Sequence, residues 1–141
     1  MNVDSIKNGF VIDHIKPEKG MAIYSFLGLD EVDGTVALIR NAASRSMGRK
    51  DIIKVDAENL RIDLSVLGYI DPEITVNVIE NEAIVKKYHP ELPEQVVDIV
   101  KCKNPRCITS TEQELKHIFK LTDRETHTYR CIYCETKAKK H

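Results

Sequence analysis

Hydrophobic residues in the first ninety positions follow two spacings, one typical of strands and one typical of helices. Apolar residues recur at helical spacing over residues 18–28, which predicts an amphipathic helix there. A second helix is expected over residues 60–70, where Leu60, Ile62, Leu64, Leu67 and Ile70 recur before Asp71-Pro72. Short branched runs bounded by glycine or polar turns predict strands over residues 9–15, 35–41, 50–56, 75–80 and 83–87, with a loop at 44–49.

The order of these elements is strand, helix, strand, strand, helix, strand, with one more strand at the end. This order fits the split βαβ arrangement, an antiparallel sheet with its helices on one face. Pro90 and Pro93 then interrupt all periodicity and indicate a linker near residues 90–100. We therefore expect two domains, residues 1–95 and residues 96–141.

All four cysteines of the chain lie in the last quarter, in two close pairs. Cys102 and Cys107 have four residues between them, and Cys131 and Cys134 have two. Two close thiol pairs separated by a short segment are typical of a protein that encloses one tetrahedral ion. Four thiolates suit Zn²⁺ and leave no open coordination position, so the predicted site is structural.

Other interpretations of the cysteines remain. Two disulfides require an oxidising compartment, whereas the first residues show no apolar signal segment, so we expect a cytoplasmic protein. Cys131-Ile132-Tyr133-Cys134 as a redox pair would need a larger α/β context. Four unrelated buried thiols would not be expected to cluster in this way. His117 and His127 lie between the pairs as spare ligands, although solvated histidines are the simpler interpretation.

A segment of about forty residues rarely folds without a staple. Structural zinc contributes on the order of 10–16 kcal/mol in small finger peptides. That exceeds what the apolar residues of the segment can supply, so chelation or Cys131→Ser is expected to unfold the chain after about residue 100. These apolar residues are Ile108, Leu115, Ile118, Phe119, Leu121, Tyr129 and Ile132.

Net charge differs between the first hundred residues and the rest of the chain. Residues 1–100 carry 11 Lys/Arg against 17 Asp/Glu, a net charge of −6. Residues 101–141 carry 10 against 5, a net charge of +5. A basic zinc module raises the alternative of a zinc-ribbon nucleic-acid-binding protein, but acidic residues interleave its basic ones. The sequence contains no run of about 18 apolar residues, so we expect no membrane-spanning helix.

Lysines gather in the otherwise acidic first domain. Lys50 and Lys54 are four residues apart, so both point to the same face of a strand, and Arg49 precedes them. Lys86 and Lys87 end the last strand and would lie near them in the predicted sheet. Such a group suits a triphosphate, with Asp13 and Asn77 available for a sugar or base. Solvated lysines that guard a sheet edge are the alternative.

A catalytic role has less support. His14 beside Asp13 invites acid–base chemistry, but no nucleophile elbow, phosphate-cradling glycine loop or open metal site accompanies them. A metal-dependent enzyme is disfavoured because four thiolates close the predicted site.

Several stretches together resemble the regulatory chain of aspartate carbamoyltransferase, over nearly the full length. They are Val11-Ile12-Asp13-His14-Ile15, Met47-Gly48-Arg49-Lys50-Asp51 with Ile53-Lys54, Ile74-Thr75-Val76-Asn77 with Ile79, Leu92-Pro93-Glu94, and the cysteine framework. The resemblance implies a ferredoxin-like allosteric domain that binds ATP or CTP, followed by a small all-β zinc domain of rubredoxin-like or zinc-ribbon-like type. It also implies a non-catalytic chain of pyrimidine biosynthesis that forms homodimers and joins two catalytic trimers into a dodecamer, without nucleic acid or membrane as partner.

The resemblance also assigns site residues. Zinc would be held by Cys102, Cys107, Cys131 and Cys134, and Asn104, Tyr133 and Glu135 would face the catalytic chain. Three positions depart from the family pattern: Glu82 where an aromatic residue is frequent, Lys86 in place of glycine, and Arg106 in place of a small polar residue. The nucleotide contacts would fall on Val3, Asp4, Ile6, Asp13, His14, Lys50, Lys54, Asn77, Ile79, Ile84 and Lys87.

Overall fold

The computed structural model describes residues 6–58, 62 and 64–138. Val3, Asp4 and Leu60, which the sequence analysis singled out, lie outside them. The chain divides into two compact units, Met1–Pro90 and Glu91–His141, and each has its own antiparallel sheet. Among the described residues no helix is long and apolar enough to cross a membrane.

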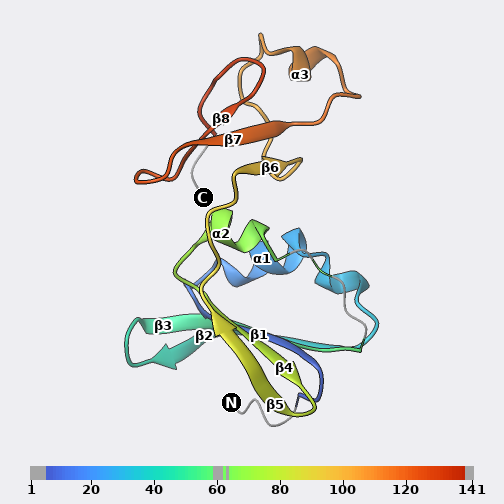
Figure 1. The fold of residues 1–141 in the computed structure, drawn as a ribbon, viewed down its shortest axis with the longest axis vertical. Coiled ribbons are helices and arrows are strands. Elements are labelled where there is room, and N and C mark those ends of the chain that lie inside the picture. Colours follow the sequence, from blue (N-terminus) through green and yellow to red (C-terminus); the bar gives the residue numbers. More distant parts are fainter. Residues whose placement is uncertain (1–5, 59–61, 63, 139–141) are drawn as a thin grey trace. The chain divides into compact units, whose positions relative to one another are not determined.

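The first unit is built on a five-stranded sheet with the order β2-β3-β1-β4-β5 (Figure 1). All four neighbouring pairs are antiparallel. The strand β3 lies between β1 and β2, as the split βαβ arrangement requires, so the predicted α+β, ferredoxin-like class is confirmed. The strands are β1 (Gly9–Ile15), β2 (Thr35–Ser44), β3 (Gly48–Asp56), β4 (Thr75–Glu80) and β5 (Ala83–Tyr88).

The helices are shorter than the periodicity predicted. The first expected helix forms as α1 (Gly20–Phe26), and a 3-10 turn, η2 (Leu29–Glu31), follows Gly28 at φ 64°. The second is only α2 (Val66–Ile70): Ile62 and Leu64, which were expected within it, are not helical, and its expected start at Leu60 lies outside the described residues. Ile62 and Leu64 are two positions apart, a spacing that lines no single face of a helix.

The loop predicted over residues 44–49 is also shorter than expected. The strand β2 continues to Ser44 and β3 begins at Gly48, which has φ 77°. Ser44 pairs with Gly48, so only residues 45–47 form the hairpin turn. Glycine adopts this left-handed conformation at little cost in free energy because it has no Cβ. This explains how a three-residue turn closes here.

One side of the first sheet forms the main core. Period-two alternation puts Phe10, Ile12, Ile53, Val55 and Val76 on one face, and each of them is buried. The helix α1 covers this face, because a Cβ added to its first residue Gly20 would meet Leu38, which pairs with Ile53. The residues between these positions therefore point to the opposite face, away from the helices.

The second unit is a three-stranded antiparallel sheet with the order β6-β7-β8. Its elements are β6 (Gln95–Val97), the short helix α3 (Ile108–Thr111), β7 (Ile118–Asp123) and β8 (Thr128–Cys131). Val96 pairs with Phe119, which pairs in turn with Cys131, and all three are buried together with Tyr129. This core is small, and a cysteine forms part of it.

Candidate metal centre and lysine face

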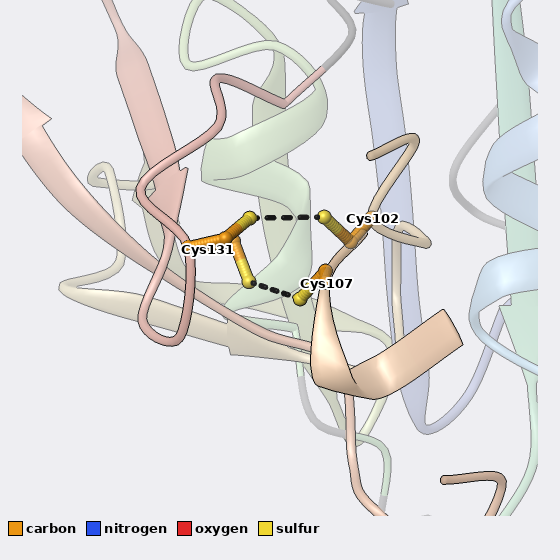
Figure 2. A group of neighbouring side chains, drawn as sticks. Cys102, Cys107 and Cys131 are labelled. Atoms are coloured by element: carbon orange, nitrogen blue, oxygen red, sulfur yellow. Dashed lines mark hydrogen bonds between the residues drawn. The ribbon is translucent and has the colours of Figure 1, made fainter. Parts of the chain in front are cut away.

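The four cysteines converge on one point in the second unit. Figure 2 labels three of them, Cys102, Cys107 and Cys131. Cys102 and Cys107 flank the loop before α3, whereas Cys131 ends β8 and Cys134 lies on the turn that follows. Their Sγ atoms all lie within 4.8 Å of one another, although the two pairs are far apart in sequence. The turns thus bring together the four thiols that the spacing singled out.

The sulfur distances fit a tetrahedral ion. Cys102 Sγ lies 3.5 Å from Cys134 Sγ, and Cys107 Sγ lies 3.7 Å from Cys131 Sγ. A disulfide would require about 2.0 Å, and all four cysteines are free. Metal–sulfur bonds of about 2.3 Å at tetrahedral angles separate neighbouring sulfurs by about 3.8 Å. The residues present therefore fit a four-thiolate metal site.

Backbone N–H groups point at the sulfurs, as tight turns predict. The N–H of Asn104 donates to Cys102, and those of Tyr133 and Cys134 donate to Cys131. The turns are closed by Cys107 N–H to Asn104 O at 3.0 Å and by Glu135 N–H to Cys131 O at 2.8 Å. These amides offset negative charge on the thiolates.

Three of the thiols differ in acidity. Burial raises the pKa of Cys102 to about 12, and burial also raises the pKa of Cys131. The Thr136 hydroxyl accepts from the Cys134 thiol and can donate to its thiolate, and this contact lowers the pKa of Cys134 to about 6. A bound cation deprotonates a coordinating thiol outright, so metal binding at this site releases protons and weakens as the pH falls.

The first unit carries a second group of polar side chains on the sheet face opposite the helices, which we call the lysine face. Lys54 pairs with Val11, Val11 with Asn77, and Asn77 with Lys87. Directly opposed residues of antiparallel strands project to the same side, so these four form one row across β3, β1, β4 and β5. Counting in twos along the strands adds Asp13, Lys50 and Ile79 to this face, and the pair Ile79–Ile84 adds Ile84.

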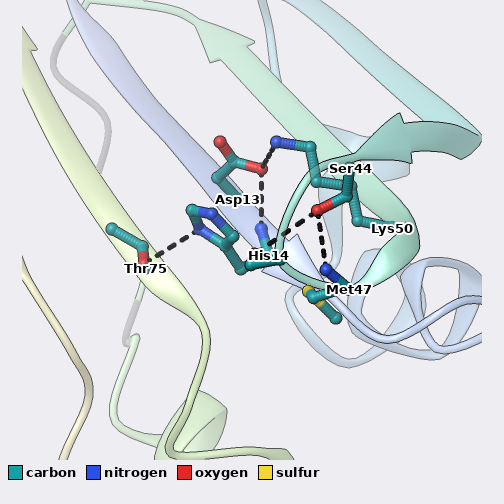
Figure 3. Close-up of polar contacts among 7 residues, drawn as sticks. Asp13, His14, Ser44, Met47, Lys50 and Thr75 are labelled. Atoms are coloured by element: carbon teal, nitrogen blue, oxygen red, sulfur yellow. Dashed lines mark hydrogen bonds and ion pairs between the residues drawn. The ribbon is translucent and has the colours of Figure 1, made fainter.

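An ion pair lies at one end of the lysine face (Figure 3). Lys50 Nζ is 2.9 Å from Asp13 Oδ1, which also accepts the backbone N–H of His14 at 2.6 Å. Burial raises the pKa of Asp13, but the hydrogen bonds and charge of Lys50, together with the His14 N–H, lower this pKa below its ordinary value. Asp13 is therefore ionised at neutral pH and can accept further hydrogen bonds.

His14 leaves the regular strand geometry. Its φ is 59°, and it lies within the irregularity between Ile12 and Ile15 in the pairing of β1 with β3. Its ring Nδ1 lies 3.2 Å from the hydroxyl of Thr75 on β4 (Figure 3). The imidazole thus lies beside the lysine face, next to Asp13.

Known protein families match both units. The model of the aspartate carbamoyltransferase regulatory chain, allosteric domain, matches residues 1–91, and that of the metal binding domain of the same chain matches residues 94–141. The chain belongs to this regulatory-chain family. The chain is thus regulatory and not catalytic, and its first domain is allosteric and its second metal-binding, which confirms the resemblance read from the sequence.

Individual relatives agree over nearly the whole length. A regulatory chain of Clostridium botulinum is 52% identical over 135 residues, which cover 96% of this chain and 92% of the relative. One of Clostridium tetani is 50% identical, with 96% and 94% covered. One of Bifidobacterium longum is 42% identical over 139 residues, with 99% of each covered.

In this regulatory chain the three predicted docking residues lie on the cysteine turns. Asn104 Oδ1 accepts the backbone N–H of Arg106 at 3.0 Å, Glu135 has φ 65°, and Tyr133 is exposed. Their contact with a catalytic chain stays a prediction. Ile108 and Ile132, two of the apolar residues noted in this segment, are 50% and 46% exposed beside the cysteines and so add little to its core.

The predicted nucleotide-binding residues of the regulatory chain differ in how far they are exposed. Ile6 is buried against Val11 and Ile79 on the lysine face, with Ile52 packed beside them. Lys54 is only 5% exposed and Asn77 only 8%, whereas Ile84 is half exposed. These roles stay predictions.

Two basic residues of the predicted lysine group point elsewhere. Arg49 lies one residue from Lys50 and donates to Asn41 O at 3.5 Å. Lys86 pairs with Val78, and its Nζ lies 4.8 Å from the ring centre of Tyr88. Period-two alternation puts both on the opposite side of their strands from the lysine face.

Thr75 was missed as a site residue, although its position two residues before Asn77 signals the same face of β4. The predicted spare ligand His117 has a different role, because its Nδ1 accepts the backbone N–H of Cys102 at 3.1 Å. His127 is exposed in the turn between β7 and β8 with φ 54°.

Proposed function

We propose that this chain is the nucleotide-responsive regulatory subunit of a cytoplasmic aspartate carbamoyltransferase, acting in pyrimidine biosynthesis. It binds ATP or CTP on the lysine face and one structural Zn²⁺ through its four cysteines. Homodimers of the chain join catalytic trimers, with three regulatory dimers and two trimers in a dodecamer. The first domain receives the effector and the second docks on the catalytic chain.

The observation that carries the effector site is the row Lys54–Val11–Asn77–Lys87. Two positions of this row, Lys54 and Lys87, carry cationic side chains, and the amide of Asn77 lies between them. A third lysine, Lys50, lies further along β3. Ammonium groups bind phosphate oxygens as point charges, and an amide offers both a donor and an acceptor to a base. The ionised Asp13 suits a ribose hydroxyl as donor.

The proposed zinc has a structural task. Four sulfurs within 4.8 Å of one another leave no place for substrate or water on a tetrahedral ion, so the ion would supply cross-linking and no reaction. The cysteine turns it ties together carry Asn104, Tyr133 and Glu135, together with the exposed Ile108 and Ile132. Holding these turns rigid gives the catalytic chain a fixed surface to bind.

The regulatory mechanism is linkage between two binding events. An effector that binds one quaternary state more tightly than another shifts their balance by that difference, typically 1–3 kcal/mol. The chain needs no catalytic residue for this. It needs a site that differs between the two states and a rigid contact with the enzyme.

Calorimetric titration of ATP and CTP into the full-length chain tests the effector site. Lys87→Ala removes a charge from the lysine face, and Lys86→Ala is the matched control one residue away. A phosphate about 4 Å from Lys87 at a partly screened surface gains about 1–4 kcal/mol. Lys87→Ala should therefore weaken binding about tenfold or more, with little change in Lys86→Ala. Equal affinities in the two variants would refute the assigned face.

Co-purification tests the partner and the metal. The tagged chain should retain the catalytic chain of aspartate carbamoyltransferase, and Lys87→Ala should leave this retention intact. A chelator, or Cys107→Ala, should abolish it. Sedimentation of the mixture should give the mass of two catalytic trimers with three regulatory dimers. Retention of the catalytic chain by a fully metal-stripped protein would refute the docking role of the metal centre.

A further inference from the structure

The second cysteine of each pair is followed two residues later by a threonine whose hydroxyl touches its sulfur. In Cys107-Ile108-Thr109, Thr109 Oγ1 donates to Cys107 Sγ at 3.1 Å. In Cys134-Glu135-Thr136, the Thr136 hydroxyl lies 3.2 Å from Cys134 Sγ. The two turns differ in length and in neighbouring structure, yet they share this Cys-x-Thr contact.

The direction of both bonds is fixed once a metal is bound. A coordinated sulfur has lost its proton and can only accept, so each hydroxyl must donate to its thiolate. Four thiolates around a divalent cation leave a net charge of −2. Hydrogen bonds to the sulfurs spread that charge and orient the ligands.

Burial makes the Thr109 bond the stronger case. Thr109 is 4% exposed and Cys107 is 2% exposed, so water is poorly placed to replace the hydroxyl as donor. Thr136 is half-buried, and it serves its turn twice, because its carbonyl also accepts the backbone N–H of Cys131 at 3.0 Å. Valine in place of either threonine keeps the shape and removes only the donor.

We propose that Thr109 and Thr136 are positioning residues of the metal centre, whose hydroxyls donate to the Cys107 and Cys134 thiolates. They slow loss of the ion by holding these two sulfurs in place. The proposal rests on the proposed zinc site. It adds that metal retention depends on a donor at these two positions, beyond the four cysteines.

The test compares zinc release from the full-length chain to an excess of a chromogenic chelator. Thr109→Val and Thr136→Val should each release zinc faster, within the 10–100-fold range typical of lost partners of metal ligands. Thr109→Ser restores the hydroxyl and should return the rate towards that of the original chain. Thr111→Val is the matched control, since the Thr111 hydroxyl donates to the Ile108 carbonyl and not to a sulfur.

Cobalt substitution supplies a readout that a packing defect would not move. The sulfur-to-cobalt charge-transfer band should shift in both valine variants and stay in place in Thr111→Val. Unchanged release rates and an unchanged band in Thr109→Val and Thr136→Val would overturn the proposal. Elemental analysis of the original chain distinguishes the two failures: a chain purified without one zinc refutes the zinc site itself, whatever the threonines do.

Discussion

Replacing Asp51 with alanine should destabilise the first unit by about 2–6 kcal/mol. Asp51 lies on β3, is 1% exposed, and accepts three backbone N–H groups from two other segments. Its Oδ2 binds the N–H of Glu18 and of Gly20, both at 3.1 Å, and its Oδ1 binds the N–H of Asn41 at 2.8 Å. One carboxylate on β3 thus connects this strand both to the start of α1 and to the irregular part of β2.

The magnitude follows from what the truncation leaves behind. The Gly20 amide is buried, and an orphaned buried donor costs about 1–3 kcal/mol. Glu18 and Asn41 are at the surface, so water can partly replace the carboxylate there, and their bonds contribute about 0.5–1.5 kcal/mol each. Glu18 and Asn41 also have φ values of 77° and 59°, so losing the acceptor releases two left-handed residues.

Hydrogen exchange resolved by peptide measures the first unit separately from the second. In Asp51→Ala the free energy of opening should fall across β1 to β3, with the segments around residues 18–20 and 41 affected first. The exposed Asp33 gives a matched control, because Asp33→Ala should stay within about 0.5 kcal/mol. Asp51→Asn should also lose most of the stabilisation that Asp51 provides, because the amide NH₂ would face a backbone N–H and both groups are donors. Equal protection in Asp51→Ala and Asp33→Ala would refute the reasoning.

Three further outcomes are expected. Lys50→Met should raise the pKa of Asp13, because burial alone raises it and Lys50 lowers it; NMR titration measures this, and an unmoved pKa would show that the ion pair does not set it. In the original chain this pair stabilises the fold above the unfolded pKa of about 3.9, and the stabilisation is lost as the pH falls through the lowered folded pKa. Glu82→Gly should stabilise the first unit by about 1 kcal/mol, because Asn81 and Glu82 have φ 50° and 68° in the β4–β5 turn and glycine adopts this left-handed conformation at less cost. Urea titration measures the change, and a lower unfolding midpoint in the variant would contradict the expectation. Chelation should abolish amide protection after about residue 100 and spare the first unit, so retained protection of β7 and β8 would count against the metal as the staple.

The metal centre could be predicted from the sequence because its geometry is local. Each cysteine pair closes on its own turn, and only the meeting of the two turns depends on the fold. The exposure of Ile108 and Ile132 could not be predicted in the same way. Apolar residues normally enter a core, but here Cys107 and Cys131 take the interior positions, and the isoleucines beside them face outward.

The lysine face could be predicted only in part. Period-two spacing put Lys50 and Lys54 on one side of a strand, and the strand order then brought Asn77 to the same face of the sheet, with β1 between them. Counting in twos from Ile84 would choose Lys86 for the same side. A register shift between Val78 and Ile79 brings Ile84 and Lys87 to that side instead. A bulge of this kind is fixed by pairing with the neighbouring strand, and nothing in the local sequence marks it.

The two units depend on different forces for their stability, and this bears on regulation. The first has a five-stranded sheet, a core of branched residues and a buried carboxylate that joins three segments, so it should keep its shape without any ligand. The second has three short strands around Val96, Phe119 and Tyr129, and its cysteines occupy positions that apolar residues would otherwise fill. Loss of metal should therefore remove docking while leaving effector binding intact. An effector titration of the metal-free chain with unchanged affinity would separate the two activities, and a lost affinity would show that the first unit also depends on the ion.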